Sequence, residues 1–228
     1  MATLLREDIE ARLAEPDLAK RLVIAPLLDK ARQIGAGSVD LRLGSEFLEV
    51  PRQDNAHIDP FEDRELKQIS GAPDRRFYVP LGDRFVLHPG QFMLGSTLEF
   101  LAIPDDVAGQ VLSRSSWGRL GLLVATAVAV QPGFRGVLTL ELVNAGSVPI
   151  VLRPGLRVAQ LQLWRGDGAT AHPYRSGGKY DAPLGPQSNR LVWEVDERKT
   201  LNRITALMHA REPVDSATAP LDDAQPTS

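Results

Sequence analysis

Short apolar runs, most of them alternating with polar residues, follow one another along the middle of the chain. They are RFYVPL, RFVLHPG, QFMLGSTLEFLAIP, VAGQVLS, GLLVATAVAV, GVLTLELVNAG, VPIVLRPG and RVAQLQLWRG, all between residues 76 and 166. A two-residue period indicates β-strands, and in HPG, QPG and RPG the proline fixes φ while the glycine accepts a positive φ. Many short strands without intervening helices predict a mainly β fold, a barrel or a sandwich.

Helical spacing occurs toward the two ends of the chain. Residues 4–14 carry Leu and Ile at helical spacing, with Glu7 and Asp8 in the first turn and Pro16 just after the end. A second short helix is expected at 26–33. GAGSVDLRLGSEFLEV at 35–50 alternates between glycines and predicts a strand, and the polar residues 51–76 predict an exposed insertion or loop.

The composition changes again after Gly166. The segment to about residue 190 is rich in Gly, Pro and Ser and predicts an arm or lid, residues 191–211 predict a helix, and the last residues predict a disordered tail. We therefore expect one domain over 1–190, including an arm at about 166–190. A C-terminal helical extension and tail would occupy 191–228.

Composition narrows the classes of function. Of 228 residues 43% are hydrophobic, as in ordinary globular proteins, and the net charge is −3, so there is no global basic field for nucleic acid or an anionic membrane. The chain has no cysteine, which excludes disulfides, a cysteine nucleophile and thiolate zinc sites. We see no signal peptide or membrane-spanning run, and we expect a cytoplasmic protein.

A lone carboxylate, Glu141, lies in the apolar strand VLTLELVN. Alternation predicts that it shares one strand face with Val137, Thr139 and Val143, while the leucines face the core. On sequence alone, a solvent-facing acid on a half-exposed strand is the more common situation. The sharper hypothesis is a pocket carboxylate that shuttles protons, with its pKa adjusted by burial.

Arg114, Ser115, Ser116 and Arg119 form R-S-S-x-x-R between apolar strands. Arginine offers a bidentate fork to phosphate oxygens, and successive hydroxyls and backbone N–H groups add short-range donors. A short capped turn with solvated arginines is the plain alternative. Two arginines flanking two serines favour anion binding.

Tyr174 and Lys179 lie in the glycine-rich arm, in HPYRSGGKY. An aromatic ring and a lysine on an arm can stack on a base and pair with phosphate, although an ordinary flexible tail has the same composition. The histidines are scattered without HxH or HExxH spacing, so a histidine metal site is not expected.

These motifs together resemble a known family. RSSWGRLGL, QPGFRG, LTLELVNAGSVPIVLRPGLRVAQL and HPY…GKY occur in the order found in the dCTP deaminase family of the dUTPase-like superfamily, over about residues 8–190. The resemblance implies a distorted, jelly-roll-like β-barrel that assembles as a homotrimer, with active sites between subunits and a covering arm. It also implies hydrolysis of dCTP to dUTP and ammonia without zinc, Mg²⁺ bound through the triphosphate, and dUTP or the effector dTTP as further ligands.

The resemblance assigns roles by motif. Glu141 would be the general acid and base that takes a proton from water attacking cytosine C4 and delivers it toward the amino group. The expected substrate-binding residues are Arg114, Ser115, Ser116, Arg119, Gln131, Thr139, Leu140, Tyr174 and Lys179. Zinc cytidine deaminases need a His/Cys/Cys or Cys₃ site, which a chain without cysteine cannot build.

Departures from the family pattern keep two alternatives open. The family has an aspartate before PGF or PGW, where this chain has Gln131, and glutamine can bind a hydroxyl but cannot act as a base. That lowers our expectation of a dUTP pyrophosphatase or a bifunctional, dUMP-forming deaminase. Pro183 stands where the family has glutamine, with Gln187 as a substitute. A catalytically silent nucleotide-binding homologue is the second alternative.

Overall fold

Strands dominate the computed structural model, which describes residues 2–50, 75–125, 129–176, 182–188 and 195–209. The elements are β1 (Ala2–Thr3), α1 (Arg6–Ala14), β2 (Val23–Ala25), α2 (Lys30–Gln33), β3 (Val39–Glu49), β4 (Arg75–Tyr78), β5 (Phe85–Leu87), β6 (Phe92–Ala102), β7 (Val107–Ser113), α4 (Ser115–Gly118), β8 (Leu122–Ala125), β9 (Ala129–Val130), β10 (Arg135–Asn144), β11 (Ile150–Leu152), β12 (Arg157–Arg165), a 3₁₀ turn at Tyr174–Ser176 and α5 (Val195–His209). The mainly β prediction is confirmed.

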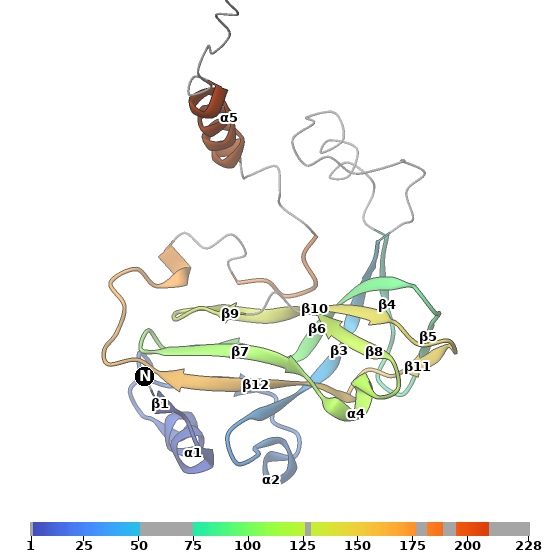
Figure 1. Cartoon of the computed structure of the whole chain (residues 1–228). Coiled ribbons are helices and arrows are strands. Elements are labelled where there is room, and N and C mark those ends of the chain that lie inside the picture. Colours follow the sequence, from blue (N-terminus) through green and yellow to red (C-terminus); the bar gives the residue numbers. More distant parts are fainter. Residues whose placement is uncertain (1, 51–74, 126–128, 177–181, 189–194, 210–228) are drawn as a thin grey trace, which may run out of the picture.

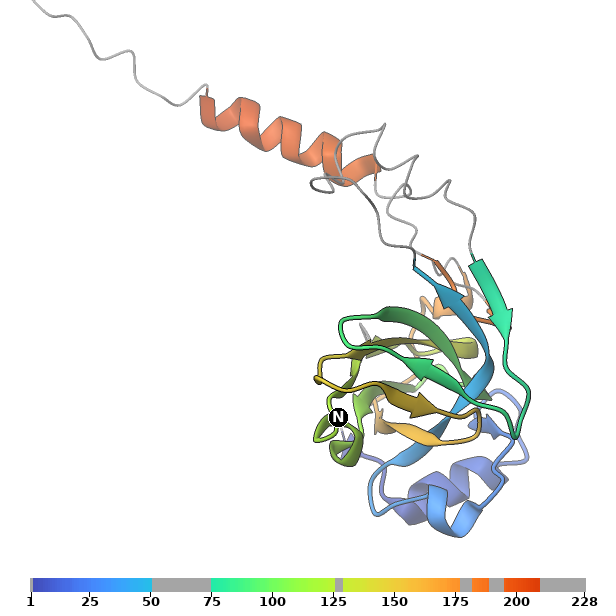
Figure 2. The same cartoon turned by 90° about the vertical axis from the view of Figure 1, so that its right-hand side faces the viewer.

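The strands form a strongly curled antiparallel sheet (Figures 1 and 2). Ten strands make up this sheet: seven follow the order β8-β10-β6-β3-β12-β7-β9, and β1, β2 and β4 pair with β12, β6 and β3 at the side. Strands β11 and β5 form a separate two-stranded sheet. The curl brings the end of β7 against β8. There the Ser113 hydroxyl donates to the Val124 carbonyl and accepts from the Val124 N–H, at 2.8 and 3.1 Å. The sheet thereby approaches the distorted barrel that we expected.

One apolar core fills the curl. Leu41, Leu101, Leu140 and Leu161, from β3, β6, β10 and β12, have no exposed surface. Alternate positions of each strand point inward, so the two-residue period of the sequence becomes a continuous inner layer. Helix α1 closes one end: its Ile9 is fully buried, and Arg12 forms an ion pair with Asp106.

The predicted elements match the observed ones with a few differences. The helix expected at 4–14 begins at Arg6, the one at 26–33 shortens to α2, and the terminal helix is α5. Strands β1 and β2 were not predicted, because two- and three-residue strands show too little periodicity. Residues 75 and 76 of the expected loop belong to β4, while 51–74, residues 177–181 and 189–190 of the arm, and the predicted tail lie outside the described residues.

The alternation in β10 breaks at its start. The register against β6 shifts between Val137 and Thr139: Val137 pairs with Phe100 and Thr139 with Ser96, so β6 carries two residues more than β10 across this step. Val137 is buried and Leu138 only partly buried, opposite to the simple alternation predicted for these two. Beyond the shift the prediction holds: Leu140 and Leu142 have no exposed surface, and Glu141 lies on the other, partly exposed face.

Candidate active site

Glu141 lies in the middle of the sheet. Its backbone pairs with Leu94 of β6 on one side and Ala125 of β8 on the other. The side chain is partly buried and makes no hydrogen bond or ion pair with any other residue that the structure describes. Burial raises the pKa of Glu141, because the surrounding protein removes water that stabilises the charged carboxylate. A carboxyl group with a raised pKa and unused oxygens is suited to proton transfer.

Thr139 precedes Glu141 by two residues on the same strand face. Its hydroxyl accepts a hydrogen bond from the backbone N–H of Gln187, at 3.1 Å. Leu140, between them, points into the core with no exposed surface, so only its backbone can border a ligand on the Glu141 face. The described part of the arm therefore reaches the strand that carries Glu141.

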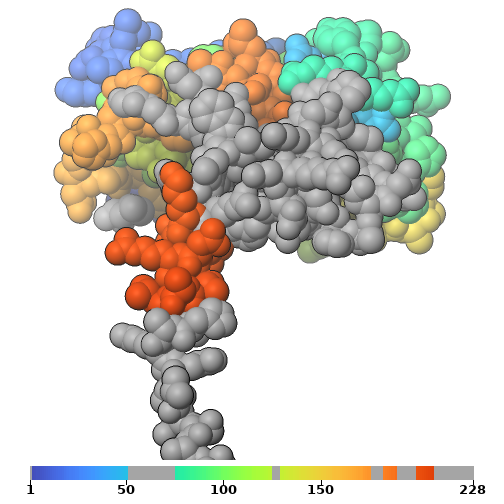
Figure 3. Space-filling view, turned by 90° about the horizontal axis from the view of Figure 1, so that it is seen from above, coloured from blue at the N-terminus to red at the C-terminus, as the bar shows by residue number. Residues whose placement is uncertain are grey.

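Residues 182–188 are anchored at the start of β10. The Val137 N–H donates to the Pro183 carbonyl at 2.8 Å. Pro183 packs directly on Gly136, which has φ of +132° and where a Cβ would lie 2.4 Å from the proline ring. Pro183, which departs from the family pattern, is thus a buried anchor, and Gln187 is the glutamine that lies beside Thr139. Figure 3 shows both described pieces of the arm, in two shades of orange, on one face.

Tyr174 docks at the turn before β10. Its N–H donates to the Pro132 carbonyl at 2.9 Å, and its ring lies 5.8 Å from that of Phe134. The next residue, Arg175, forms an ion pair with Asp105 that lowers the pKa of this carboxyl. Gln131 is exposed and begins the same turn, with its carbonyl accepting from the Phe134 N–H at 3.1 Å. The structure therefore brings Gln131 and Tyr174 together.

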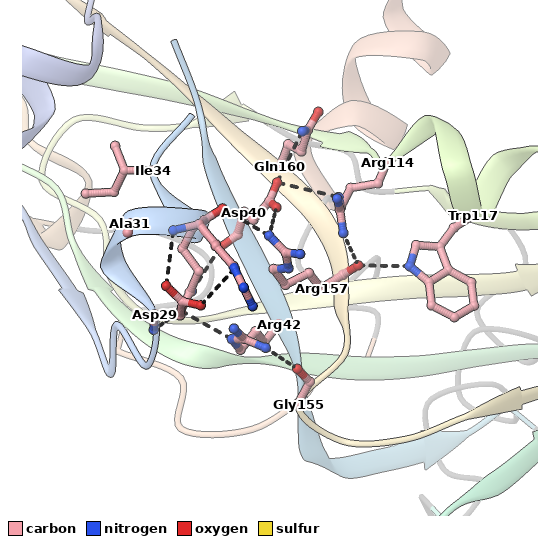
Figure 4. A network of polar contacts seen from close by, with 12 residues as sticks. Asp29, Ala31, Ile34, Asp40, Arg42, Arg114, Trp117, Gly155, Arg157 and Gln160 are labelled. Atoms are coloured by element: carbon pink, nitrogen blue, oxygen red, sulfur yellow. Dashed lines mark hydrogen bonds and ion pairs between the residues drawn. The ribbon is translucent and has the colours of Figure 1, made fainter. Parts of the chain in front are cut away.

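The R-S-S-x-x-R motif forms the short helix α4 between β7 and β8. Ser115, Ser116 and Arg119 are exposed there. Arg114, by contrast, is held: its Nε lies 3.5 Å from Asp40 Oδ1, and its Nη1 donates to the Arg157 carbonyl at 3.0 Å (Figure 4). The first N–H groups of a helix have no intrahelical acceptor. The turn thus combines hydroxyl, amide and guanidinium donors, which is the chemistry of anion binding.

Within one chain these donors and Glu141 lie at different ends of β8. Glu141 pairs opposite Ala125, the last residue of the strand, whereas α4 leads into the first residue, Leu122. At about 3.3 Å per residue these two strand positions lie roughly 10 Å apart. Lys179 lies outside the described residues. No helix that the structure describes is both long and apolar enough to cross a membrane, and no three described His, Asp or Glu side chains form a metal cluster.

Comparison with known proteins assigns this architecture to a family. Residues 3–166 match the family model described as dCTP deaminase-like. The chain belongs to the dCTP deaminase-like family. The resemblance inferred from the motifs is therefore confirmed.

Relatives of the dCTP deaminase-like family match most of the chain. The dCTP deaminase of Natronomonas pharaonis is 44% identical over 187 residues, which is 81% of this chain and 92% of that protein. A dCTP deaminase, dUMP-forming, of Dictyoglomus thermophilum is 41% identical over 189 residues, 78% of this chain and 94% of that protein. Both alignments stop short of the full chain.

A solved structure shares the fold. The crystal structure of 2'-deoxycytidine 5'-triphosphate deaminase from Agrobacterium tumefaciens matches with a TM-score of 0.53 and 27% sequence identity. The match covers 72% of this chain and 47% of that one, so this chain spans about half its length.

Proposed function

We propose that this protein hydrolyses dCTP to dUTP and ammonia, with Glu141 as the general acid and base. The observation that carries the proposal is the partly buried Glu141 carboxylate, which has a raised pKa and lies two residues after Thr139, the strand residue that accepts a hydrogen bond from the arm. The family membership and relatives named dCTP deaminase support the same conclusion.

The reaction consumes one water. Glu141 takes a proton from the water as its oxygen bonds to C4 of the cytosine ring, and a tetrahedral centre forms. Glu141 then delivers that proton to the exocyclic nitrogen, and the second proton of the water passes to N3 of the ring. The C4–N bond breaks, and ammonia leaves with uracil as the product base. A pKa above the ordinary value helps because one group must both accept and release the proton.

The triphosphate is held by the R-S-S-x-x-R turn. Ser115, Ser116 and Arg119 have exposed donors there, and Arg114 adds a fixed positive charge. Thr139, Gln131 and the backbone of Leu140 border the sugar and base, and Tyr174 and Lys179 contribute from the arm. Mg²⁺ accompanies the nucleotide through its phosphate oxygens and screens their charge. Zinc has no part in the proposed chemistry.

The functional unit is a homotrimer with its active sites between subunits. The separation of Glu141 from α4 within one chain supports this, because a neighbouring subunit can then bring its anion-binding turn to Glu141. We further propose that the enzyme works in the cytoplasm, supplies dUTP for thymidine nucleotide synthesis, and takes dTTP as an effector. Light scattering that shows a monomer at assay concentration would contradict the shared site.

A bifunctional, dUMP-forming reaction is the second candidate. A relative 41% identical to this chain carries that name, which favours it. Gln131 argues against it, since an amide at this position cannot act as a base toward a water that attacks the phosphate chain.

Incubation with each deoxynucleoside triphosphate and Mg²⁺, followed by separation of the products, tests the proposal. We expect dUTP and one equivalent of ammonia from dCTP and no pyrophosphate. Release of pyrophosphate and dUMP would establish the second candidate. Saturable binding of dCTP without turnover would show a silent homologue and overturn the proposed activity.

A further inference from the structure

Asp40 of β3 is a nearly buried carboxylate surrounded by cations and donors (Figure 4). Its Oδ2 lies 3.0 Å from Nη1 of Arg157, and its Oδ1 accepts from Nε2 of Gln160 at 3.1 Å. The same Oδ1 lies 3.5 Å from Nε of Arg114. Only 9% of the Asp40 side chain is exposed, so two guanidinium groups share one carboxylate largely out of water.

The Arg157 backbone completes the arrangement. Its carbonyl accepts from Arg114 Nη1 at 3.0 Å and from Trp117 Nε1 at 2.8 Å. Arg114 and Trp117 bracket Ser115 and Ser116, so both ends of the anion-binding turn are attached to β12. Asp40 contacts both the Arg157 side chain, on β12, and Arg114, at the end of β7. These two contacts fix the orientation of the turn as well as its position.

The contacts of Arg114 leave part of its guanidinium unused. Nε faces Asp40 and Nη1 faces the Arg157 carbonyl, whereas Nη2 has no partner among the described residues. Arginine binds phosphate best when its fork is oriented in advance, because less side-chain entropy is then lost on binding. A nearly buried carboxylate beside Nε provides that orientation.

We propose that Asp40 is a positioning residue for the triphosphate, acting through Arg114 and the Ser115–Ser116 turn. This inference rests on the proposed function, in which that turn holds the substrate phosphates. Asp40 itself does not touch the nucleotide, since cations and Gln160 surround its oxygens. Its effect is therefore expected on nucleotide affinity more than on the chemical step at Glu141.

The variant Asp40→Asn tests the role, because it keeps the size of the side chain and removes its charge. We expect a rise in the KM for dCTP on the order of tenfold or more, with kcat within about threefold of the wild type. Asp29→Asn is the matched control: Asp29 caps α2 and pairs with Arg32, with no contact to Arg114. It should leave KM unchanged.

A double-mutant cycle separates positioning from a general structural effect. In an Arg114→Gln background, Asp40→Asn should raise KM by less than about threefold, because the residue it acts through is already gone. Multiplicative effects in the double variant would overturn the proposal. If Asp40→Asn does not fold, Gln160→Leu serves instead, since it removes one hydrogen bond to Asp40 and keeps every charge. It should raise KM several-fold, and an unchanged KM would contradict us.

The affinity for dCTP is also measured on the same proteins, by calorimetric titration. Absence of turnover in the wild type would overturn the proposed function alone, since binding is still observed. Equal dCTP affinities in the wild type and in Asp40→Asn would overturn the positioning role alone, even if both proteins release ammonia.

Discussion

The backbone N–H of Gln187 donates a hydrogen bond to the hydroxyl of Thr139, 3.1 Å away and two residues before Glu141. Together with the bond from the Val137 N–H to the Pro183 carbonyl, it lays residues 182–188 along the start of β10. The part of the chain that follows the barrel thus borders the face of the sheet on which the carboxylate lies. This contact joins the arm to the chemistry that we propose.

Removing the Thr139 hydroxyl should loosen the arm. Thr139→Val keeps the β-branched shape and leaves the Gln187 N–H without its acceptor, at a cost of about 1–3 kcal/mol if that group stays buried. We expect faster proteolysis within 182–188 and a KM for dCTP raised about tenfold. Thr170→Val, which removes a hydroxyl from an exposed turn, is the control. Equal cleavage rates in Thr139→Val and the wild type would refute the anchoring role.

The pH dependence of activity should report Glu141. Burial raises its pKa, so the carboxylate becomes protonated at a higher pH than an exposed glutamate does. A protonated Glu141 cannot accept the proton of the attacking water, so kcat/KM should fall as the pH drops through that raised pKa. We expect the acidic limb above the ordinary glutamate value of 4.5.

The variant Glu141→Asp distinguishes an acidic limb of kcat/KM caused by residue 141 from one caused by ionisation of the nucleotide. A limb that belongs to residue 141 should move in that variant, whereas one caused by dCTP should stay in place. An acidic limb at or below the ordinary glutamate value, unmoved in Glu141→Asp, would mean that another group controls the rate.

A second buried acid, Glu99, should govern stability against pH. It has no exposed surface, and burial raises its pKa to about 7, although Gln33 Nε2 and the Arg42 N–H donate to it at 3.0 and 2.8 Å. The folded state therefore holds a proton between about pH 4.5 and 7 that the unfolded chain has lost. Stability should fall by about 3 kcal/mol as the pH rises through this window.

Urea unfolding at a fixed protein concentration and several pH values checks this expectation. Glu99→Gln should flatten the curve between pH 4.5 and 7, while Glu7→Gln, at an exposed position of the first helix, should leave the slope intact. A wild-type stability that rises with pH across the window would show that Glu99 is not the controlling group.

Glu99 and Glu141 also mark the limit of what the sequence predicts. Both are lone acids in apolar strands, and both give the same local pattern. Turn chemistry and alternation predicted the β12 and β10 strands and the leucine face, because those depend on neighbours in sequence. Whether an acid is buried against Gln33 and Arg42, as Glu99 is, or lies on a partly exposed face, as Glu141 does, depends on residues far along the chain.

The Asp40 arrangement was missed for the same reason. Asp40 alternates with Val39 and Leu41 and resembles an ordinary outward residue of a strand. Its partners come from positions 114, 157 and 160, and only the pairing of β3 and β7 with β12 brings them to it. The register shift between β10 and β6 was equally invisible, since it depends on which residues of two distant strands pair. The motifs alone pointed to Glu141 and the R-S-S-x-x-R turn as candidate site residues.

The most direct measurement compares ammonia release from dCTP by the wild type and Glu141→Gln near neutral pH, with dCTP affinity and melting temperature determined on the same samples. The amide cannot carry a proton between water and the amino group, so we predict a rate lower by about 10²–10⁴-fold with unchanged affinity. The melting temperature should not fall, because the amide removes the cost of a partly buried charge. A folded, dCTP-binding Glu141→Gln protein that keeps a substantial part of the wild-type rate would contradict the account.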